Sequence, residues 1–147
     1  MGLSEEKIVR AGYPRCIYQK QYERVETFDH NIIENRGLPK DTRIAAYTPT
    51  YRNNQKGELF TAAIPDVARM IEVCEREHIL MIFKMHPLLE KEAGFLQAKQ
   101  AYQDNPWIMF WDNRDDFYEV LDRVDLCIMD YSSIFTDFVL AGVKHFL

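Results

Sequence analysis

The sequence lacks the features that would assign a short chain to a special structural class. Its 147 residues include only 6 Gly, 6 Pro and 3 Cys, which excludes a collagen-like repeat and a disulfide scaffold. The three cysteines form no C-x-x-C pair and lie at no zinc-site spacing from a histidine. No apolar run reaches the ~20 residues of a membrane-spanning helix, and the N-terminus has no apolar signal region. These absences predict a reduced, cytoplasmic protein and give no sign of a metal site.

Positive charge is also scarce. Lys and Arg number 18 against 23 Asp and Glu, so the net charge is −5, whereas a nucleic-acid-binding domain is usually basic. Apolar residues make up 47% of the chain and aromatic residues 13%, which is enough for the packed core of one domain. We therefore expect no nucleic-acid partner, and any anion site must be built locally from a few cationic side chains and backbone N–H groups.

The common nucleotide-binding motifs are missing too. The chain contains neither G-x-G-x-x-G nor G-x-x-x-x-G-K-[ST], and it has no H-E-x-x-H or EF-hand pattern. A dinucleotide fold of the usual kind and a P-loop therefore lose their main sequence support.

What is present is an alternation of short apolar runs with segments of helical periodicity. Continuous apolar runs such as ILMIFK at 79–84 are typical of strands buried on both faces, and apolar residues three and four apart between Ile64 and Cys74 indicate a helix. We expect strands at 43–47, 79–84, 107–111, 125–129 and 143–147, and helices at 64–77, 88–103, 115–123 and 132–142. This order predicts an α/β fold, a Rossmann-like parallel sheet with helices on both faces. The last strand has no covering helix after it, so we expect the chain to be part of a longer protein.

Polar side chains follow these strands at the points where each one ends. Ligands of open parallel sheets bind beyond the carboxyl ends of the strands. Thr50 and Arg52 follow the first strand, His86 follows the second, and Ser132 and Ser133 follow the fourth, at the expected start of a helix. Free N–H groups at a helix start favour a phosphate, so this edge predicts a diphosphate site without a glycine-rich loop.

Each of these residues also has a purely structural interpretation. The two serines could be helix N-caps, His86 a hydrogen-bonded loop histidine, Arg52 a solvated side chain, and Asp130 a cap or salt-bridge partner. Their joint placement after successive strands favours the shared site.

Four segments together resemble a known family, in order and in spacing. They are Gly12-Tyr13-Pro14-Arg15, YTPTYR at 47–52, KMHP at 84–87, and DLCIMDYSSIFTDF at 125–138. From about Gly12 to Leu147 the chain is similar to the CDP-glycerol glycerophosphotransferases, the teichoic acid and capsule polymerases and primases, and the D-Y-S-S segment is the most specific. The resemblance implies the C-terminal lobe of a two-lobed GT-B enzyme. Residues 1–42 would be an N-terminal connecting segment with the G-Y-P-R motif, and residues 43–147 the Rossmann-like donor-nucleotide-binding domain.

The resemblance also implies a reaction. An acceptor hydroxyl attacks the β-phosphorus of CDP-glycerol, CMP leaves, and a phosphodiester forms in teichoic acid or capsular polysaccharide. No metal or other cofactor is implied, so positive donors must neutralise the diphosphate. By this likeness His86 is the catalytic residue and stabilises the leaving phosphate. The implied substrate- and nucleotide-binding residues are Arg15, Thr50, Arg52, Ser132, Ser133 and Asp137, with Asp137 beside the donor's polyol or ribose hydroxyls.

The chain departs from the family pattern in two places. The family's other key histidine, a candidate general base, belongs to an N-terminal lobe that has no counterpart here, and G-Y-P-R is followed by Cys16-Ile17 instead of Asn-Asp. We therefore expect the chain alone to be inactive. The implied partners are a CDP-polyol, a polymer or lipid-linked acceptor, and the missing lobe, with the full-length protein peripheral on the inner face of the cell membrane. A non-catalytic nucleotide- or phosphate-binding module, and a GT-B transferase using CDP-ribitol or a nucleotide sugar, remain alternatives.

Overall fold

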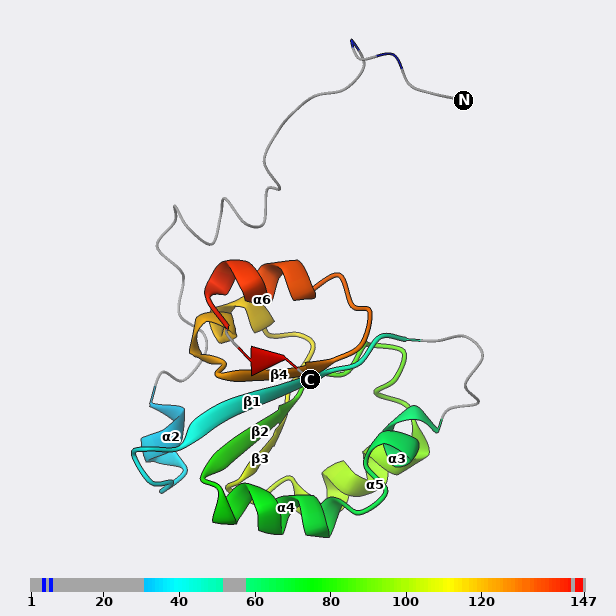
Figure 1. The fold of residues 1–147 in the computed structure, drawn as a ribbon. Helices are drawn as coiled ribbons and strands as arrows, with labels where there is room; N and C mark the ends of the chain where they lie inside the picture. Colours follow the sequence, from blue (N-terminus) through cyan, green and yellow to red (C-terminus); the bar gives the residue numbers. More distant parts are fainter. Residues whose placement is uncertain (1–3, 5, 7–30, 52–57, 144, 147) are drawn as a thin grey trace.

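The fold is that of a parallel sheet between two helical layers (Figure 1). The computed structural model describes residues 4, 6, 31–51, 58–143 and 145–146. In chain order the elements are α2 (Ile32–Asn35), β1 (Arg43–Thr48), α3 (Leu59–Ala63), α4 (Val67–Arg76), β2 (Ile79–Phe83), α5 (Ala93–Tyr102), β3 (Ile108–Phe110), the 3₁₀ helices η2 (Phe117–Glu119) and η3 (Leu121–Arg123), β4 (Leu126–Met129), α6 (Phe135–Ala141) and β5 (His145–Phe146).

The five described strands run parallel in the order β3-β2-β1-β4-β5. In the register of the central strand, Ala45 lies opposite Met81 of β2 on one side and Leu126 of β4 on the other. The chain therefore reverses its direction of growth at β1, and the junction of β1 and β4 is the topological switch point where open α/β sheets bind ligands. The Rossmann-like sheet with helices on both faces is confirmed.

Aromatic side chains fasten the α3–α5 layer to the sheet. The ring of Phe60 lies 5.4 Å from those of both Phe83 and Phe95, and Phe110 lies 5.3 Å from Phe83 and 5.5 Å from Phe95. Phe60 and Phe83 are fully buried, and each such ring contributes about 1.5–3 kcal/mol through burial. This cluster fastens β2 and β3 to the helical layer at Phe83 and Phe110, the last residues of the two strands.

A smaller aromatic cluster fastens the opposite face. Phe117 of η2 contacts Trp111 after β3, at 5.1 Å between ring centroids, and Phe138 of α6 at 6.2 Å. All three rings are buried. Because helices cover both faces of the sheet, as Figure 1 shows, the central strands read as continuous apolar runs rather than alternating ones.

The predicted helix at 64–77 is wrong at its start, and a short helix that was not predicted, α3, precedes it. Pro65 separates two helices, and the Asp66 carboxylate accepts from the Arg69 N–H at 2.8 Å to cap α4. α3 exists because the buried carboxylate of Glu92 accepts from the N–H of Phe60 at 2.8 Å and from that of Thr61 at 3.4 Å. A partner more than thirty residues away leaves no local signal in the sequence.

Other predicted elements are shorter in the structure. The helix expected at 88–103 begins only at Ala93, because the chain after Pro87 turns with the Leu89 N–H bonded to the His86 carbonyl at 2.7 Å. The helix expected at 115–123 is the pair of 3₁₀ helices, and the described part of the last strand is two residues long. Gly142 ends α6 in the left-handed conformation, with φ 92°.

The described part of the predicted connecting segment packs on the domain. Ile32 and Leu38 are buried in the common core. The Arg36 guanidinium donates to the carbonyl oxygens of Asn105, Pro106 and Ile108 at 3.3, 3.3 and 3.0 Å, which fastens the end of α2 to the start of β3. These contacts lie at the amino end of the sheet, away from the predicted ligand edge.

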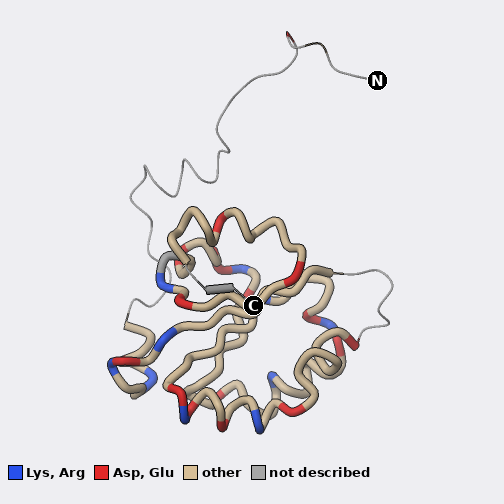
Figure 2. The backbone as a smooth tube through the Cα atoms, in the orientation of Figure 1, with Lys and Arg blue, Asp and Glu red and all other residues tan. Residues whose placement is uncertain are grey.

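Charged residues of both signs are interspersed over the two helical layers, as Figure 2 shows. On α4, for example, the exposed side chains of Arg69 and Glu72 form an ion pair at 2.5 Å. Within the described ranges the longest helices, α4 and α5, hold ten residues each, and none offers the length and apolarity needed to cross a membrane. Cys74 and Cys127 are buried, as expected for small core residues, and burial raises the pKa of each thiol to about 11.

Candidate functional site

The loops after β1 and β4 meet at the switch point. The backbone N–H of Thr50 donates to Oδ1 of Asp130 at 2.9 Å, which joins two loops that are eighty residues apart in the chain. Next to Thr50, the ring of Tyr51 stacks on the imidazole of His86, with the centroids 5.5 Å apart and the planes 24° from parallel. The carboxyl ends of β1, β2 and β4 therefore form one connected edge, as the sequence predicts.

The imidazole of His86 is exposed and its tautomer is set by the loop. The Leu88 N–H donates to Nδ1 at 3.2 Å, so in the neutral ring the proton resides on Nε2. Nε2 is then a hydrogen-bond donor held at the sheet edge, which suits contact with a phosphate oxygen.

A polar cluster lies directly behind His86. Lys84 Nζ donates to Oδ1 of Asn113, and Nδ2 of Asn113 donates to the carbonyl oxygen of Met85 at 3.0 Å. Burial lowers the pKa of the half-buried Lys84 ammonium, while the charge of Glu90 acts in the opposite direction. The cluster links the end of β2 to the turn that follows β3.

Hydroxyl and phenol groups supply further polarity at the end of β1. Oγ1 of Thr50 is buried and has no hydrogen-bond partner in the part of the chain that the structure describes. Burial, with smaller contributions from the charges of Asp130 and Glu92, raises the pKa of Tyr47 to about 12. Tyr47 therefore keeps its phenolic proton at neutral pH. The Thr50 hydroxyl, which lacks a partner among the described residues, is of the kind that a polar ligand satisfies.

The serine pair does not begin a helix, which corrects the prediction for this segment. The Ser132 N–H donates to the Asp130 carbonyl at 2.8 Å and the Phe135 N–H to the Ser132 carbonyl at 3.2 Å, so residues 130–134 form a tight turn. The N-cap of α6 is Ile134, and no side chain caps it. Ser132 and Ser133 still follow β4 at the sheet edge, but neither the helix dipole nor a capping role explains them.

Asp137 points into the protein. Its side chain is 1% exposed, and it accepts a hydrogen bond from the Tyr118 hydroxyl at 2.7 Å. This bond ties α6 to η2 beneath the site. The carboxylate thus holds α6 in place in this conformation, and the predicted contact with donor hydroxyls stays a prediction.

Two predicted cations cannot be placed, and a third nearby cation is already paired. Arg15 and Arg52 lie outside the described residues. Arg114, in the turn after β3, binds both carboxylate oxygens of Asp112 through Nε and Nη2, at distances from 2.5 to 3.1 Å. The Arg114 side chain holds the pKa of Asp112 well below its usual range.

Sequence reasoning missed the supporting residues of the site. Lys84 and Tyr51 stood in the matched segments and Asn113 among the residues that follow strands, but none was singled out. Their position directly beside or after a strand end is the signal that could have found them. Each acts on the loop that carries His86, a relation that only the folded chain reveals.

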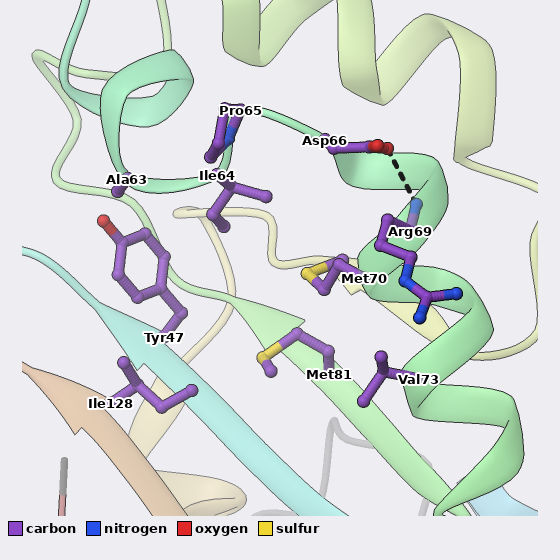
Figure 3. A pocket seen from close by; sticks show the side chains of 10 residues that line it. All are labelled: Tyr47, Ala63, Ile64, Pro65, Asp66, Arg69, Met70, Val73, Met81 and Ile128. Atoms are coloured by element: carbon purple, nitrogen blue, oxygen red, sulfur yellow. Dashed lines mark hydrogen bonds between the residues drawn. The ribbon is translucent and has the colours of Figure 1, made fainter.

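A pocket of about 470 Å³ lies between α4 and the sheet (Figure 3). Its described lining is mostly apolar and includes none of the predicted site residues. It consists of Tyr47, Ala63, Ile64, Pro65, Asp66, Arg69, Met70, Val73, Met81 and Ile128. In the close-up, Asp66 is turned to the Arg69 backbone, so its carboxylate is engaged in capping α4.

The fold and the edge residues define a Rossmann-like domain with a polar switch-point site of the kind that binds nucleotides. The chain belongs to the CDP-Glycerol:Poly(glycerophosphate) glycerophosphotransferase family, whose model matches residues 1–142. This confirms the resemblance drawn from the four segments.

Several named proteins are similar to this chain. The teichoic acid poly(glycerol phosphate) polymerase of Bacillus spizizenii is 30% identical over 144 residues, which cover 96% of this chain and 34% of the relative. The ribitol-phosphate polymerase TarK of Staphylococcus aureus is 26% identical, over 95% of this chain and 26% of its own length. The solved wall teichoic acid polymerase TagF superposes with a TM-score of 0.69 at 23% identity, over 99% of this chain and 34% of TagF. The chain thus spans about a third or less of these proteins.

Proposed function

We propose that this chain is the donor-binding part of a polyol-phosphate transferase and that it holds a CDP-polyol at the carboxyl edge of its sheet. The observation that carries the proposal is the joined edge itself, in which Asp130, Thr50, Tyr51 and His86 connect the ends of three strands at the switch point. Support also comes from the relatives, which are named as polymerases of poly(glycerol phosphate) and ribitol phosphate, and from a TagF variant soaked with CDPG.

In the proposed reaction an acceptor hydroxyl attacks the β-phosphorus of the donor. A new P–O bond forms to the acceptor while the P–O bond to CMP breaks, and CMP departs with the bonding electron pair. His86 would donate its Nε2 proton, or a hydrogen bond from it, to the leaving phosphate oxygen. The proton of the attacking hydroxyl would go to a base in the remainder of the longer protein, which this chain does not contain. The acceptor is a polymer or a lipid-linked primer.

Positive donors would then offset the charge of the diphosphate without a metal cofactor. Arg15 and Arg52 are the proposed cations, and the hydroxyls of Thr50, Ser132 and Ser133 are the proposed neutral donors. With a lipid-linked acceptor, the longer protein would work as a peripheral protein at the inner face of the membrane.

Nucleotide binding by the chain tests this proposal. We expect CDP-glycerol or CDP-ribitol to raise the melting temperature of the chain, since a ligand that binds the native state stabilises it by mass action. Glycerol phosphate should not. His86→Ala should reduce the shift, whereas Glu75→Ala, an exposed substitution on α4, should leave it unchanged. An equal shift in the His86 variant would place the donor elsewhere.

The two arms of this experiment separate glycerol from ribitol donors, and a third arm with UDP-sugars tests a nucleotide-sugar transferase. We also expect no steady release of CMP from CDP-glycerol by this chain alone, because the proposed base belongs to a further lobe. Steady release would contradict the expectation that catalysis needs a further lobe.

A further inference from the structure

The side chain of Asn113 bridges two groups that directly precede His86 in the chain, the Lys84 ammonium and the Met85 carbonyl. Its Oδ1 accepts from Lys84 Nζ, and its Nδ2 donates to the Met85 carbonyl at 3.0 Å. Lys84 Nζ also approaches that carbonyl, at 3.5 Å. One amide side chain in the turn after β3 therefore uses both of its polar ends on Lys84 and Met85, the two residues that directly follow β2.

The carbonyl that Asn113 holds belongs to the peptide unit shared by Met85 and His86. A peptide unit is planar, so fixing the direction of its C=O also fixes the direction of its N–H and of the bond to the next Cα. The Met85 side chain is fully buried, which anchors the other side of the same unit. The Asn113 hydrogen bond and the buried Met85 side chain thereby fix the orientation of the peptide that enters His86.

Lys84 makes this link costly to break. The side chain is half-buried, and within the described ranges no carboxylate lies within ion-pair distance of its ammonium. Its described hydrogen-bond acceptors are the neutral oxygens of Asn113 and Met85. A partly buried ammonium that loses such acceptors is left desolvated without hydrogen bonds, which is unfavourable. The hydrogen bonds between Lys84, Asn113 and Met85 are therefore costly to break.

The ring of His86 is held from the front by different contacts. Leu88 N–H donates to Nδ1, and Tyr51 stacks on the ring face. Both contacts hold a ring whose backbone follows the Met85–His86 peptide, so we expect a change in the orientation of this peptide to weaken them. We therefore expect the hydrogen bonds of Asn113 and the contacts of the His86 ring with Leu88 and Tyr51 to depend on one another.

We propose that Asn113, together with Lys84, is a positioning residue that sets the orientation and tautomer of His86. This inference builds on the proposed function, because His86 matters only if the edge binds a donor. It gives the chain a second group of functional residues that touch no substrate.

Nuclear magnetic resonance of the histidine side chains tests the inference without any ligand. In the parent chain, long-range ¹H–¹⁵N correlations of ¹⁵N-histidine should show His86 mainly as the Nε2–H tautomer, with proton shifts displaced by the Tyr51 ring. Asn113→Ala should mix the tautomers and reduce that displacement. Asn113→Asp, which keeps an acceptor for Lys84 but removes the donor to Met85, should do the same, and Lys84→Arg should restore parent-like signals more closely than Lys84→Met.

Asn105→Ala is the matched control. Asn105 is another asparagine whose side chain is hydrogen-bonded in a turn, since its Oδ1 accepts from the Trp107 N–H at 2.9 Å, but it lies before β3 at the opposite end of the sheet. It should lower the melting temperature and leave the His86 signals unchanged. Parent-like His86 signals in a folded Asn113 variant would overturn the inference, and if Asn113→Ala does not fold, Asn113→Asp and Lys84→Met decide it.

Addition of CDP-glycerol separates this inference from the proposed function. If the nucleotide leaves the His86 signals of the parent chain unchanged while the Asn113 variants still disturb them, the positioning link stands and the donor site is wrong. If the nucleotide shifts His86 equally in parent and variants, the donor site stands and the positioning role is wrong.

Discussion

The backbone N–H of Thr50 donates to the carboxylate of Asp130, and this bond directly connects the loops that follow β1 and β4. It crosses the switch point of the sheet, where β1 pairs with β4, a strand from a distant part of the sequence. The residues on both sides of it, Tyr51 and Ser132 among them, take their positions from the same two loops.

Asp130→Ala should destabilise the chain and weaken donor binding together. It leaves the Thr50 N–H without its acceptor, at a cost of about 1–3 kcal/mol in the free energy of unfolding. Asp130→Asn keeps an oxygen at the same place and should lose less. Urea unfolding measures both variants, and equal losses for Asn and Ala would mean that the carboxylate charge matters rather than the bond to Thr50.

Glu92→Ala should melt the start of α3. The buried carboxylate accepts from the N–H groups of Phe60 and Thr61, so its removal leaves the buried amide of Phe60 unpaired and should cost about 1–3 kcal/mol. Hydrogen exchange should be faster at Phe60 and unchanged at Leu80 in β2. Glu75→Ala serves as the exposed control, and slow exchange at Phe60 in the Glu92 variant would contradict the assignment.

Gly142→Ala should destabilise the end of α6 through the backbone alone. The residue has φ 92°, a region that L-residues enter at a cost of about 1–2 kcal/mol. Apart from its chain neighbours and its own helix backbone, no atom of the described residues lies within 4 Å of a Cβ placed there. Gly142→Asn should cost less, because Asn tolerates the left-handed region better. Thermal unfolding of the two variants compares them, and a stability of the Ala variant equal to the parent's would argue against a fixed left-handed cap.

The pair of Asp41 and His78 should make stability depend on pH at the acid end. His78 Nδ1 lies 2.9 Å from Asp41 Oδ2, and the hydrogen bond lowers the pKa of Asp41 from its ordinary value of 3.8. A depressed carboxyl pKa adds stability that is present above the ordinary value and is lost as the pH falls through the folded-state value. Asp41→Asn should therefore be less stable than the parent chain near pH 6, and the gap should close below pH 3.8.

Urea unfolding between pH 3 and pH 6 checks this expectation, and added salt should shrink the gap because the carboxylate of Asp41 is exposed. Asp104→Asn, in the exposed turn after α5, is the control and should show no such convergence. A constant difference between parent and Asp41→Asn over this range would exclude the linkage.

The strands and the sheet edge were predictable because their determinants are local. Buried parallel strands are runs of apolar residues, and the position after a strand is visible in the sequence, so the placement of Thr50 and His86 followed directly. The helix at α3 was not predictable, since its amides are satisfied by Glu92 from a distant segment.

The serine pair and Asp137 show a second kind of limit. Ser132-Ser133 has the composition of a helix start, but the backbone bond between Ser132 and Asp130 uses the residues in a turn. The resemblance implies that Asp137 lies beside the donor's hydroxyls, whereas in the structure its carboxylate is buried and accepts from the Tyr118 hydroxyl. In both cases the partner, and not the residue type, decides the role.

The central place of β1 has a consequence for the order of folding. Its pairing with β2 joins residue 43 to residue 79, whereas its pairing with β4 joins residue 45 to residue 126 and closes a much longer loop. During synthesis, strands β1, β2 and β3 can therefore associate before β4 has been made. The edge that would hold the donor is completed only when β4 pairs with β1. A nascent chain can therefore form the β1–β2–β3 part of its sheet before the candidate site exists.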